Sequence, residues 1–167
     1  MTAAGVLAAL ESRGETLAVA ESLTGGLLAA TLVDVPGASR VFRGGLVVYA
    51  TDLKATLADV PAELLAAEGP VHPAVATALA VGARRRCGAD WGVATTGVAG
   101  PDPQHGIAVG TVYVAVSHAV EPVAEAVRRL ELAGTRAAIR LATVTATLDL
   151  LAAALRSLGS REESNGQ

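Results

Sequence analysis

The sequence predicts an α/β domain in which helices cover both faces of a sheet. Segments with helical and strand periodicity alternate for most of the 167 residues, an order typical of layered α/β folds. Hydrophobic residues make up 51% of the chain, which is enough for one full core. Aromatic residues make up only 2%, so we expect a core of alanine, valine and leucine in which helices pack tightly on the sheet.

The first part of the chain predicts a helix, a strand and a second helix. Threonine favours helix N-caps, so Thr2 is expected to begin a helix that Gly14 ends. The apolar run over residues 16–20 predicts a buried strand. Small and hydroxyl residues follow this strand and lead into a helix that ends at about Val33, before a Pro-Gly turn.

The middle of the chain predicts a second strand and three helices. A threonine or an aspartate can cap the first of these helices, and a proline opens each of the other two. The third helix has apolar residues on nearly all sides and three arginines in its last turn, which favours a helix that is sandwiched or lies at a subunit interface. The predicted ranges are residues 45–49 for the strand and 51–60, 61–69 and 73–87 for the helices.

The last part of the chain predicts three more strands and a long closing helix. The strands are expected over residues 91–96, 110–117 and 123–132, and the helix over residues 135–158. Charges on the last strand indicate an edge or a solvated face. The longest irregular segment, rich in glycine and proline, separates the first two of these strands. We expect one domain over residues 1–159 and a flexible polar tail over residues 160–167.

Composition and charge argue against several classes of protein. The net charge of −3 provides no broad positive surface, so nucleic-acid binding is disfavoured. The single cysteine, Cys87, cannot form an internal disulfide and has no metal-binding spacing around it, which indicates a reducing, cytoplasmic setting. The N-terminus lacks the basic start of a signal peptide, and no apolar run reaches the roughly 18 residues of a membrane helix. We therefore expect a soluble protein without membrane contact.

Polar side chains follow three predicted strands at their carboxyl ends, where open α/β sheets bind ligands. Ser22 follows the first strand, Tyr49 and Lys54 the second, and Thr96 the third. Ser22 could act as a nucleophile with Lys54 as its base, because burial can lower the pKa of a lysine until it loses its proton. Lys54 is the only lysine among 13 basic residues, and arginine cannot replace it in that role. Each residue alone also has a common structural role, as a cap, a packing residue or a solvated charge.

Candidate substrate-binding residues lie in the same segments and at the start of the closing helix. Glycine allows backbone N–H groups to approach a ligand closely, and a helix N-terminus favours an anion or an oxyanion. Two arginines four residues apart share one helix face and can bind a phosphate, although a solvated face explains them equally well. The candidates are Thr24, Gly25, Gly26, Gly97, Gly100, Arg136 and Arg140.

The three histidines, His72, His105 and His118, match no metal or catalytic-triad pattern. His105 lies in the glycine-rich loop and is the only one that we keep as a marginal candidate. The sequence also lacks GxGxxG, Walker A and GxSxG motifs. We therefore predict no metal site.

Five segments, in this order, resemble the CinA C-terminal domain family: AESLTGG at residues 20–26, GGLVVYATDLKATL at 44–57, TTGVAGPD at 95–102, VGTVYVAV at 109–116 and AGTRAAIR at 133–140. The resemblance covers almost the whole chain. It implies a three-layer α/β/α sandwich with a mixed, mostly parallel sheet of about five strands, in a homodimer or larger homo-oligomer. The resemblance does not include the separate N-terminal domain of full-length CinA proteins, so we expect the stand-alone form.

The characterised activity of this family implies an amidohydrolase that converts nicotinamide mononucleotide to nicotinate mononucleotide and ammonia in pyridine-nucleotide salvage. The implied partner is a small-molecule nucleotide, and no metal or organic cofactor is implied. On matching positions, Ser22 is the motif serine, and Tyr49 and Lys54 are the tyrosine and lysine five residues apart. Thr96 is the hydroxyl residue before the Gly-hydrophobic-Ala-Gly-Pro motif, and Arg136 is the motif arginine. Tyr49 and Thr96 would relay protons or position the amide.

The expected mechanism is acyl transfer to Ser22. Neutral Lys54 would take the proton of Ser22, and the N–H groups of Gly25 and Gly26 would stabilise the oxyanion. The motif arginine, together with Arg140, would hold the 5′-phosphate. A second mechanism, in which Lys54 activates water and Ser22 only binds the carboxamide, fits the sequence equally well.

Two departures from the family pattern lie beside the expected cleft. Residues 102–110 lack the Lys-Pro and most of the glycines that commonly follow Gly-Pro, and Leu132 stands where a phenylalanine is often found. These changes bear on substrate preference and turnover more than on the fold. They leave open a catalytically weak nucleotide-binding or competence-associated interaction module with the same cleft, or an amidohydrolase for a related amide.

Overall fold

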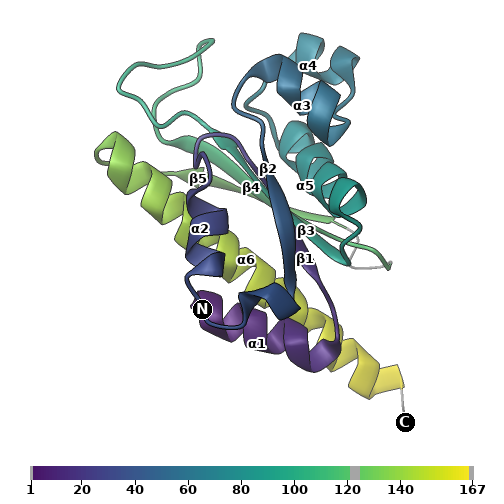
Figure 1. Cartoon of the computed structure of the whole chain (residues 1–167). Helices are drawn as coiled ribbons and strands as arrows, with labels where there is room; N and C mark the ends of the chain where they lie inside the picture. The colour runs from purple at the N-terminus through teal and green to yellow at the C-terminus, as the bar shows by residue number, and fades with distance from the viewer. Residues whose placement is uncertain (1, 121–124, 166–167) are drawn as a thin grey trace.

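The computed structural model describes residues 2–120 and 125–165, which form a five-stranded sheet between two layers of helices (Figure 1). The helices are α1 (Ala3–Arg13), α2 (Leu27–Val33), α3 (Thr51–Ala58), α4 (Ala62–Glu68), α5 (Pro73–Cys87) and α6 (Arg136–Asn165), with a 3-10 turn, η1 (Ala38–Arg40), between α2 and the second strand. The strands are β1 (Leu17–Glu21), β2 (Phe42–Val47), β3 (Trp91–Gly97), β4 (Thr111–His118) and β5 (Glu125–Glu131). The prediction of a layered α/β domain is confirmed.

The sheet has the strand order β2-β1-β3-β4-β5. β1 pairs in parallel with β2 and β3, whereas β4 pairs antiparallel with β3 and β5. Of the described strands, four therefore run in one direction and β4 runs against them, so the sheet is mixed and mostly parallel. Because β1, β2 and β3 are parallel, their carboxyl ends lie at the same edge of the sheet, and the loops that follow them meet there.

Helices cover both faces of the sheet, with α1, α2 and α6 on one face and α3, α4 and α5 on the other (Figure 1). The side chains of β1 alternate between the two hydrophobic clusters. Leu17 and Val19 pack in the cluster under α1, α2 and α6, and Ala18 and Ala20 pack in the cluster under α5. The strand is buried on both faces, as its continuous apolar run predicts.

Helix α5 lies so close to its neighbours that two contact positions need glycine. A Cβ atom on Gly82 would lie 1.9 Å from the carbonyl oxygen of Ala58 in α3. A Cβ atom on Gly92 of β3 would lie 1.9 Å from the carbonyl oxygen of Ala80 in α5. Contacts this close exist because the core consists of small residues and is closely packed. They hold α3, the helix that carries Lys54, against α5.

Several predicted boundaries differ from the structure. β2 spans Phe42–Val47 rather than residues 45–49, so Tyr49 lies in the loop beyond the strand. The described part of β5 is Glu125–Glu131, and its predicted start at Val123 lies outside the described residues. α6 continues to Asn165, so most of the segment predicted as a polar tail is helical. The arginine and glutamates of this segment are good helix formers, which explains why the helix does not end at residue 158.

Part of α6 is long and apolar enough to span a membrane when length and composition alone are considered. This part is Arg136–Leu158, whose mean hydropathy reaches 1.6. It contains Arg140 and Asp149, so it is not an uninterrupted apolar run. Half of the apolar stretch is buried inside the domain, where α6 contacts β4. The core helix of a soluble domain has this character.

Candidate active site

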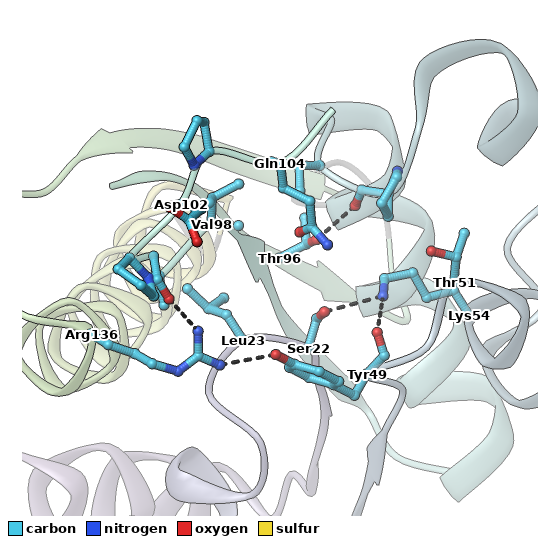
Figure 2. Close-up of a pocket in the computed structure, with 17 residues that line it drawn as sticks. Ser22, Leu23, Tyr49, Thr51, Lys54, Thr96, Val98, Asp102, Gln104 and Arg136 are labelled. Carbon is cyan, nitrogen blue, oxygen red and sulfur yellow. Dashed lines mark hydrogen bonds between the residues drawn. The ribbon is translucent and has the colours of Figure 1, made fainter. Parts of the chain in front are cut away.

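A cavity of about 290 Å³ opens at the carboxyl ends of β1, β2 and β3, beneath the loop that joins β3 to β4 (Figure 2). A larger groove of about 600 Å³ lies beside α5 and contains none of the predicted site residues. Seven of those residues line the smaller cavity: Ser22, Tyr49, Lys54, Thr96, Gly97, Gly100 and Arg136. The structure thus brings together residues from segments that are far apart in the sequence.

Ser22 is the first residue after β1 and lies at the wall of the cavity, where it is 7% exposed. Its N–H group donates to the carbonyl oxygen of Thr95 on β3 at 3.0 Å, which continues the pairing of the two strands by one residue. The chain then turns sharply. The N–H group of Gly25, whose φ is 57°, donates to the carbonyl oxygen of Ser22 at 3.1 Å.

Lys54 reaches Ser22 from α3 and is 1% exposed. Its Nζ atom donates to Ser22 Oγ at 3.1 Å and to the carbonyl oxygen of Tyr49 at 3.2 Å (Figure 2). It also donates to the carbonyl oxygen of Val48 at 2.8 Å. All three of these acceptors are uncharged. Burial lowers the pKa of Lys54 to about 8, and the nearby carboxylate of Asp52 opposes this shift in part.

These contacts suit an amine that acts as a base. A neutral lysine has two N–H groups and one lone pair. The carbonyl oxygens of Val48 and Tyr49 can accept the two N–H groups, which turns the lone pair of Lys54 toward the hydroxyl of Ser22. An amine held in this way can take the hydroxyl proton.

Arg136, the first residue of α6, lies at the mouth of the cavity. Its Nη1 donates to the carbonyl oxygen of Gly100 at 2.6 Å, and its Nη2 donates to the hydroxyl of Tyr49 at 2.9 Å (Figure 2). Tyr49 is 60% exposed. The guanidinium therefore links the loops that follow β2 and β3. The carboxylate of Asp102 also lines the cavity.

The wall formed by β3 and its loop supplies a hydroxyl group and two glycines. The Oγ1 of Thr96 donates to the carbonyl oxygen of Pro70 at 2.6 Å, so its lone pairs remain available to accept from a ligand. Gly100 has a φ of 83°, and a Cβ atom there would lie 2.7 Å from the side chain of Val109. A Cβ atom on Gly97 would lie 2.7 Å from a side chain of β4. Glycine at both positions lets the loop fold closely over the cavity.

Four predicted binding residues do not line the cavity: Thr24, Gly25, Gly26 and Arg140. Thr24 is fully buried and shares a hydrogen bond of 2.8 Å with a threonine hydroxyl of β3. The N–H group of Gly26 donates to the carboxylate of Glu21 at 3.1 Å, and that of Gly25 is used within the turn. These two groups are therefore already paired, and the prediction that they hold an oxyanion is not supported. Arg140 donates to two carbonyl oxygens of the loop after β1 at 3.0 and 2.7 Å, so it braces that loop.

The loop after β3 adds lining residues that the sequence analysis did not single out, among them Asp102 and Gln104. Gln104 and Ile107 exchange two backbone hydrogen bonds, at 3.1 and 2.8 Å. Between them, His105 and Gly106 have φ values of 50° and 77°, as in the two-residue turns of hairpins. The turn holds Gln104 at the cavity, while His105 does not line it. The His-Gly pair is the sequence signal from which this turn could have been predicted, because such turns need residues that adopt a positive φ.

The other two histidines have structural contacts. The Nδ1 of His72 accepts from the N–H group of Ala74 at the start of α5, at 3.3 Å. The ring of His118 lies against Trp91, with 4.3 Å between ring centroids. In the part of the chain that the structure describes, no group of three histidine, cysteine, aspartate or glutamate side chains could hold a metal ion.

Comparison with known sequences places this arrangement in a family. The sequence model of the CinA C-terminal domain matches residues 1–155. The chain belongs to the CinA C-terminal domain family. A CinA-like protein from Frankia casuarinae is 50% identical over 157 residues, which are 94% of this chain and 36% of that protein. The chain spans about a third of the length of the curated CinA relatives that it matches.

Solved structures of the CinA superfamily share the fold. Competence/damage inducible protein CihA from Agrobacterium tumefaciens has a TM-score of 0.86 at 33% identity, over 91% of this chain and 92% of that chain. A competence-damaged protein (CinA) superfamily protein from Klebsiella pneumoniae has a TM-score of 0.88 at 29% identity, over 93% and 96% of the two chains. The family resemblance and the fold that it implies are confirmed.

Proposed function

We propose that this CinA-family domain is an amidohydrolase that deamidates nicotinamide mononucleotide to nicotinate mononucleotide and ammonia, in pyridine-nucleotide salvage. The observation that supports this most is the buried amine of Lys54, 3.1 Å from the hydroxyl of Ser22 in a cavity. A serine attacks an amide efficiently only when a base takes its proton, and a lysine with a lowered pKa is such a base. The choice of this particular amide rests on the family resemblance.

In the proposed reaction, Lys54 takes the hydroxyl proton as Ser22 Oγ bonds to the carboxamide carbon. The C–N bond then breaks, and ammonia leaves with the proton that Lys54 returns. The nicotinoyl group remains on Ser22 as an ester. Water next gives a proton to Lys54 as the water oxygen bonds to the ester carbon. The bond between that carbon and Ser22 Oγ then breaks, Lys54 returns the proton to Oγ, and nicotinate mononucleotide is released. These steps use no cofactor.

Other lining groups suit the two ends of this substrate. The oxygen of Thr96 can accept an N–H group of the carboxamide, because its own proton goes to Pro70. Arg136 and Tyr49 lie at the mouth of the cavity and can both donate to a phosphate. The guanidinium of Arg136 would then exchange its contact with Gly100 for phosphate oxygens. Binding at both ends would favour the nucleotide over free nicotinamide.

A mechanism in which Lys54 activates water directly requires the same residues. Intact-mass analysis of the protein, quenched during turnover of a slow amide substrate, separates the two mechanisms. An adduct on Ser22 supports the acyl-enzyme. Turnover without any adduct, and with slow but measurable activity in Ser22→Ala, supports direct attack by water.

The proposed activity is tested by ammonia release from nicotinamide mononucleotide by the purified domain, with Lys54→Arg as the matched control. That substitution keeps the charge and removes the base. A wild-type protein as inert as Lys54→Arg refutes the deamidase. Tight binding of the mononucleotide without ammonia identifies a nucleotide-binding module, and ammonia from a different amide identifies another substrate.

We also propose that the domain forms a homodimer or a larger homo-oligomer, an expectation supported by the family resemblance. Sedimentation velocity at micromolar concentration measures the mass in solution. A single species at the 16.7 kDa of one chain contradicts this part of the proposal.

A further inference from the structure

We propose that Glu21 is a positioning residue that holds the hydroxyl of Ser22 in line with Lys54. The inference rests on the proposed function, because it takes Ser22 to be the reactive group. Three observations support it. The side chain of Glu21 accepts three hydrogen bonds, it is completely buried, and the backbone of Glu21 contacts Val48 in the loop that binds Lys54.

The carboxylate of Glu21 spans the turn that contains Ser22. Glu21 is the last residue of β1 and is fully buried. Its Oε2 accepts from the N–H groups of Gly26 at 3.1 Å and Leu28 at 3.0 Å, and its Oε1 accepts from the N–H group of Ala29 at 2.8 Å. The side chain of Glu21, the residue before Ser22, is therefore joined to the start of α2, which begins five residues after Ser22.

Within residues 2–120 and 125–158, Glu21 is the residue whose side chain caps this end of α2. The N-cap residue is Gly26, which has no side chain with which to cap the helix. In most helices a serine, threonine or aspartate at the N-cap provides the acceptor that the first N–H groups need. Here Glu21 provides it from the preceding strand. The short turn between them is consequently held at both ends, and Ser22 lies within it.

The backbone of Glu21 also helps to hold Lys54 in place, through Val48. Its carbonyl oxygen accepts from the N–H group of Val48 at 2.9 Å. The carbonyl oxygen of Val48 in turn accepts from Lys54 Nζ at 2.8 Å. Loss of the carboxylate would free the turn at Ser22 and leave this backbone contact in place. The expected defect is therefore in the orientation of Ser22 and not in the state of Lys54.

The test compares Glu21→Gln with the wild type by the second-order rate at which a fluorophosphonate probe labels Ser22. Glutamine keeps the shape but replaces one acceptor oxygen with an NH₂ group, which cannot accept an N–H. We expect labelling to slow by about tenfold or more, and kcat for ammonia release to fall by a similar factor, while KM stays within about twofold. The apparent pKa of the labelling reaction should stay at the wild-type value, since the side chain of Glu21 is not among the three acceptors of Lys54.

Three further variants separate positioning from general loss of stability. Glu63→Gln is the matched control, because Glu63 is an exposed carboxylate in the first turn of α4, and this variant should label at the wild-type rate. Leu79→Ala weakens the core on the face of the sheet opposite to α2. This variant should have a lower Tm, but as long as it is folded its Ser22 should be labelled at the wild-type rate. Glu21→Asp keeps the charge with a shorter reach and should label at an intermediate rate. It also decides the question if Glu21→Gln does not fold.

Wild-type labelling in a folded Glu21→Gln or Glu21→Asp variant overturns the proposal. The proposal is also overturned if Leu79→Ala, at an equal loss of Tm, slows the labelling of Ser22 as much as the Glu21 variants do. A third contrary result is a Glu21→Gln variant whose KM rises while its kcat stays constant. If the wild type is labelled at Ser22 but releases no ammonia, and Glu21→Gln slows the labelling, the role of Glu21 stands and only the deamidase is refuted.

Discussion

The guanidinium of Arg136 donates to the hydroxyl of Tyr49 at 2.9 Å, which joins two residues that lie 87 positions apart in the chain. The same guanidinium binds the carbonyl oxygen of Gly100. These contacts connect the start of α6 to the loops after β2 and β3, at the mouth of the cavity. A charged group held in this place is well oriented for an anionic ligand before the ligand arrives.

Tyr49→Phe should weaken substrate binding more than catalysis. The change removes the hydroxyl that orients Arg136 and can itself donate to a phosphate. We expect KM for nicotinamide mononucleotide to rise by about three- to tenfold, the effect of one lost hydrogen bond, with kcat within about twofold of wild type. Steady-state ammonia release measures both constants. An unchanged KM, or a fall in kcat alone, contradicts this role for Tyr49.

The rate should depend on pH through Lys54. Its pKa is lowered to about 8 by burial, and only the neutral amine can act as the base. We therefore expect kcat/KM to rise by about tenfold per pH unit below pH 8 and to level off above it. A profile from pH 6 to 10 tests this. A rate that is independent of pH across this range shows that Lys54 is not the base.

The same buried amine should make the domain less stable at neutral pH than at alkaline pH. An unfolded chain keeps the lysine proton up to a pKa of about 10.4, whereas the folded domain releases it near 8. Between these values the unfolded state binds more protons, so the free energy of unfolding increases with pH.

Lys54→Met should remove this pH dependence and stabilise the domain at pH 7 by about 1–3 kcal/mol, because a buried charge is replaced by an apolar side chain. Urea denaturation of both proteins at pH 7 and 9.5 measures the difference. If the stability of the two proteins changes equally between these pH values, Lys54 is not the source of the effect.

Gly82→Ala should disturb both stability and activity. Its Cβ atom would lie 1.9 Å from the backbone oxygen of Ala58, so α3 and α5 must move apart. We expect a loss of about 2–4 kcal/mol in the free energy of unfolding, and a lower kcat because α3 carries Lys54. Arg85→Ala, on the exposed side of α5, is the control and should change stability by less than about 0.5 kcal/mol. Equal stability of the two variants contradicts the close contact.

Local signals in the sequence predicted most of the elements. The threonine at position 2 caps α1 through a hydrogen bond to the N–H group of Gly5, and Gly14 ends that helix with a φ of 67°. Both roles depend only on the residue and its immediate neighbours. The start of β2 was not predictable in this way, because Phe42 is in the strand through its pairing with Leu17 of β1.

The sequence by itself determined the order of helices and strands, the small-residue core, and the placement of Ser22, Tyr49 and Thr96 near the carboxyl ends of parallel strands. Each of these follows from periodicity or residue type over a short stretch of chain. The same reasoning could not separate ligand-binding groups from groups that already have partners inside the protein. Gly26 and Arg140, for example, are residue types that commonly form anion-binding sites, and the sequence does not show whether they are free to do so.

Only the tertiary structure decided which of these groups have partners. Gly26 donates to Glu21, and Arg140 donates to the loop after β1, because folding brings those acceptors within reach. The same holds for Lys54, which the sequence allows to be either a solvated charge or a base. Its exposure of 1% and its contact with Ser22 come from α3, β1 and the loop after β2 packing together. Desolvation sets the pKa of a lysine, and desolvation depends on every element around it.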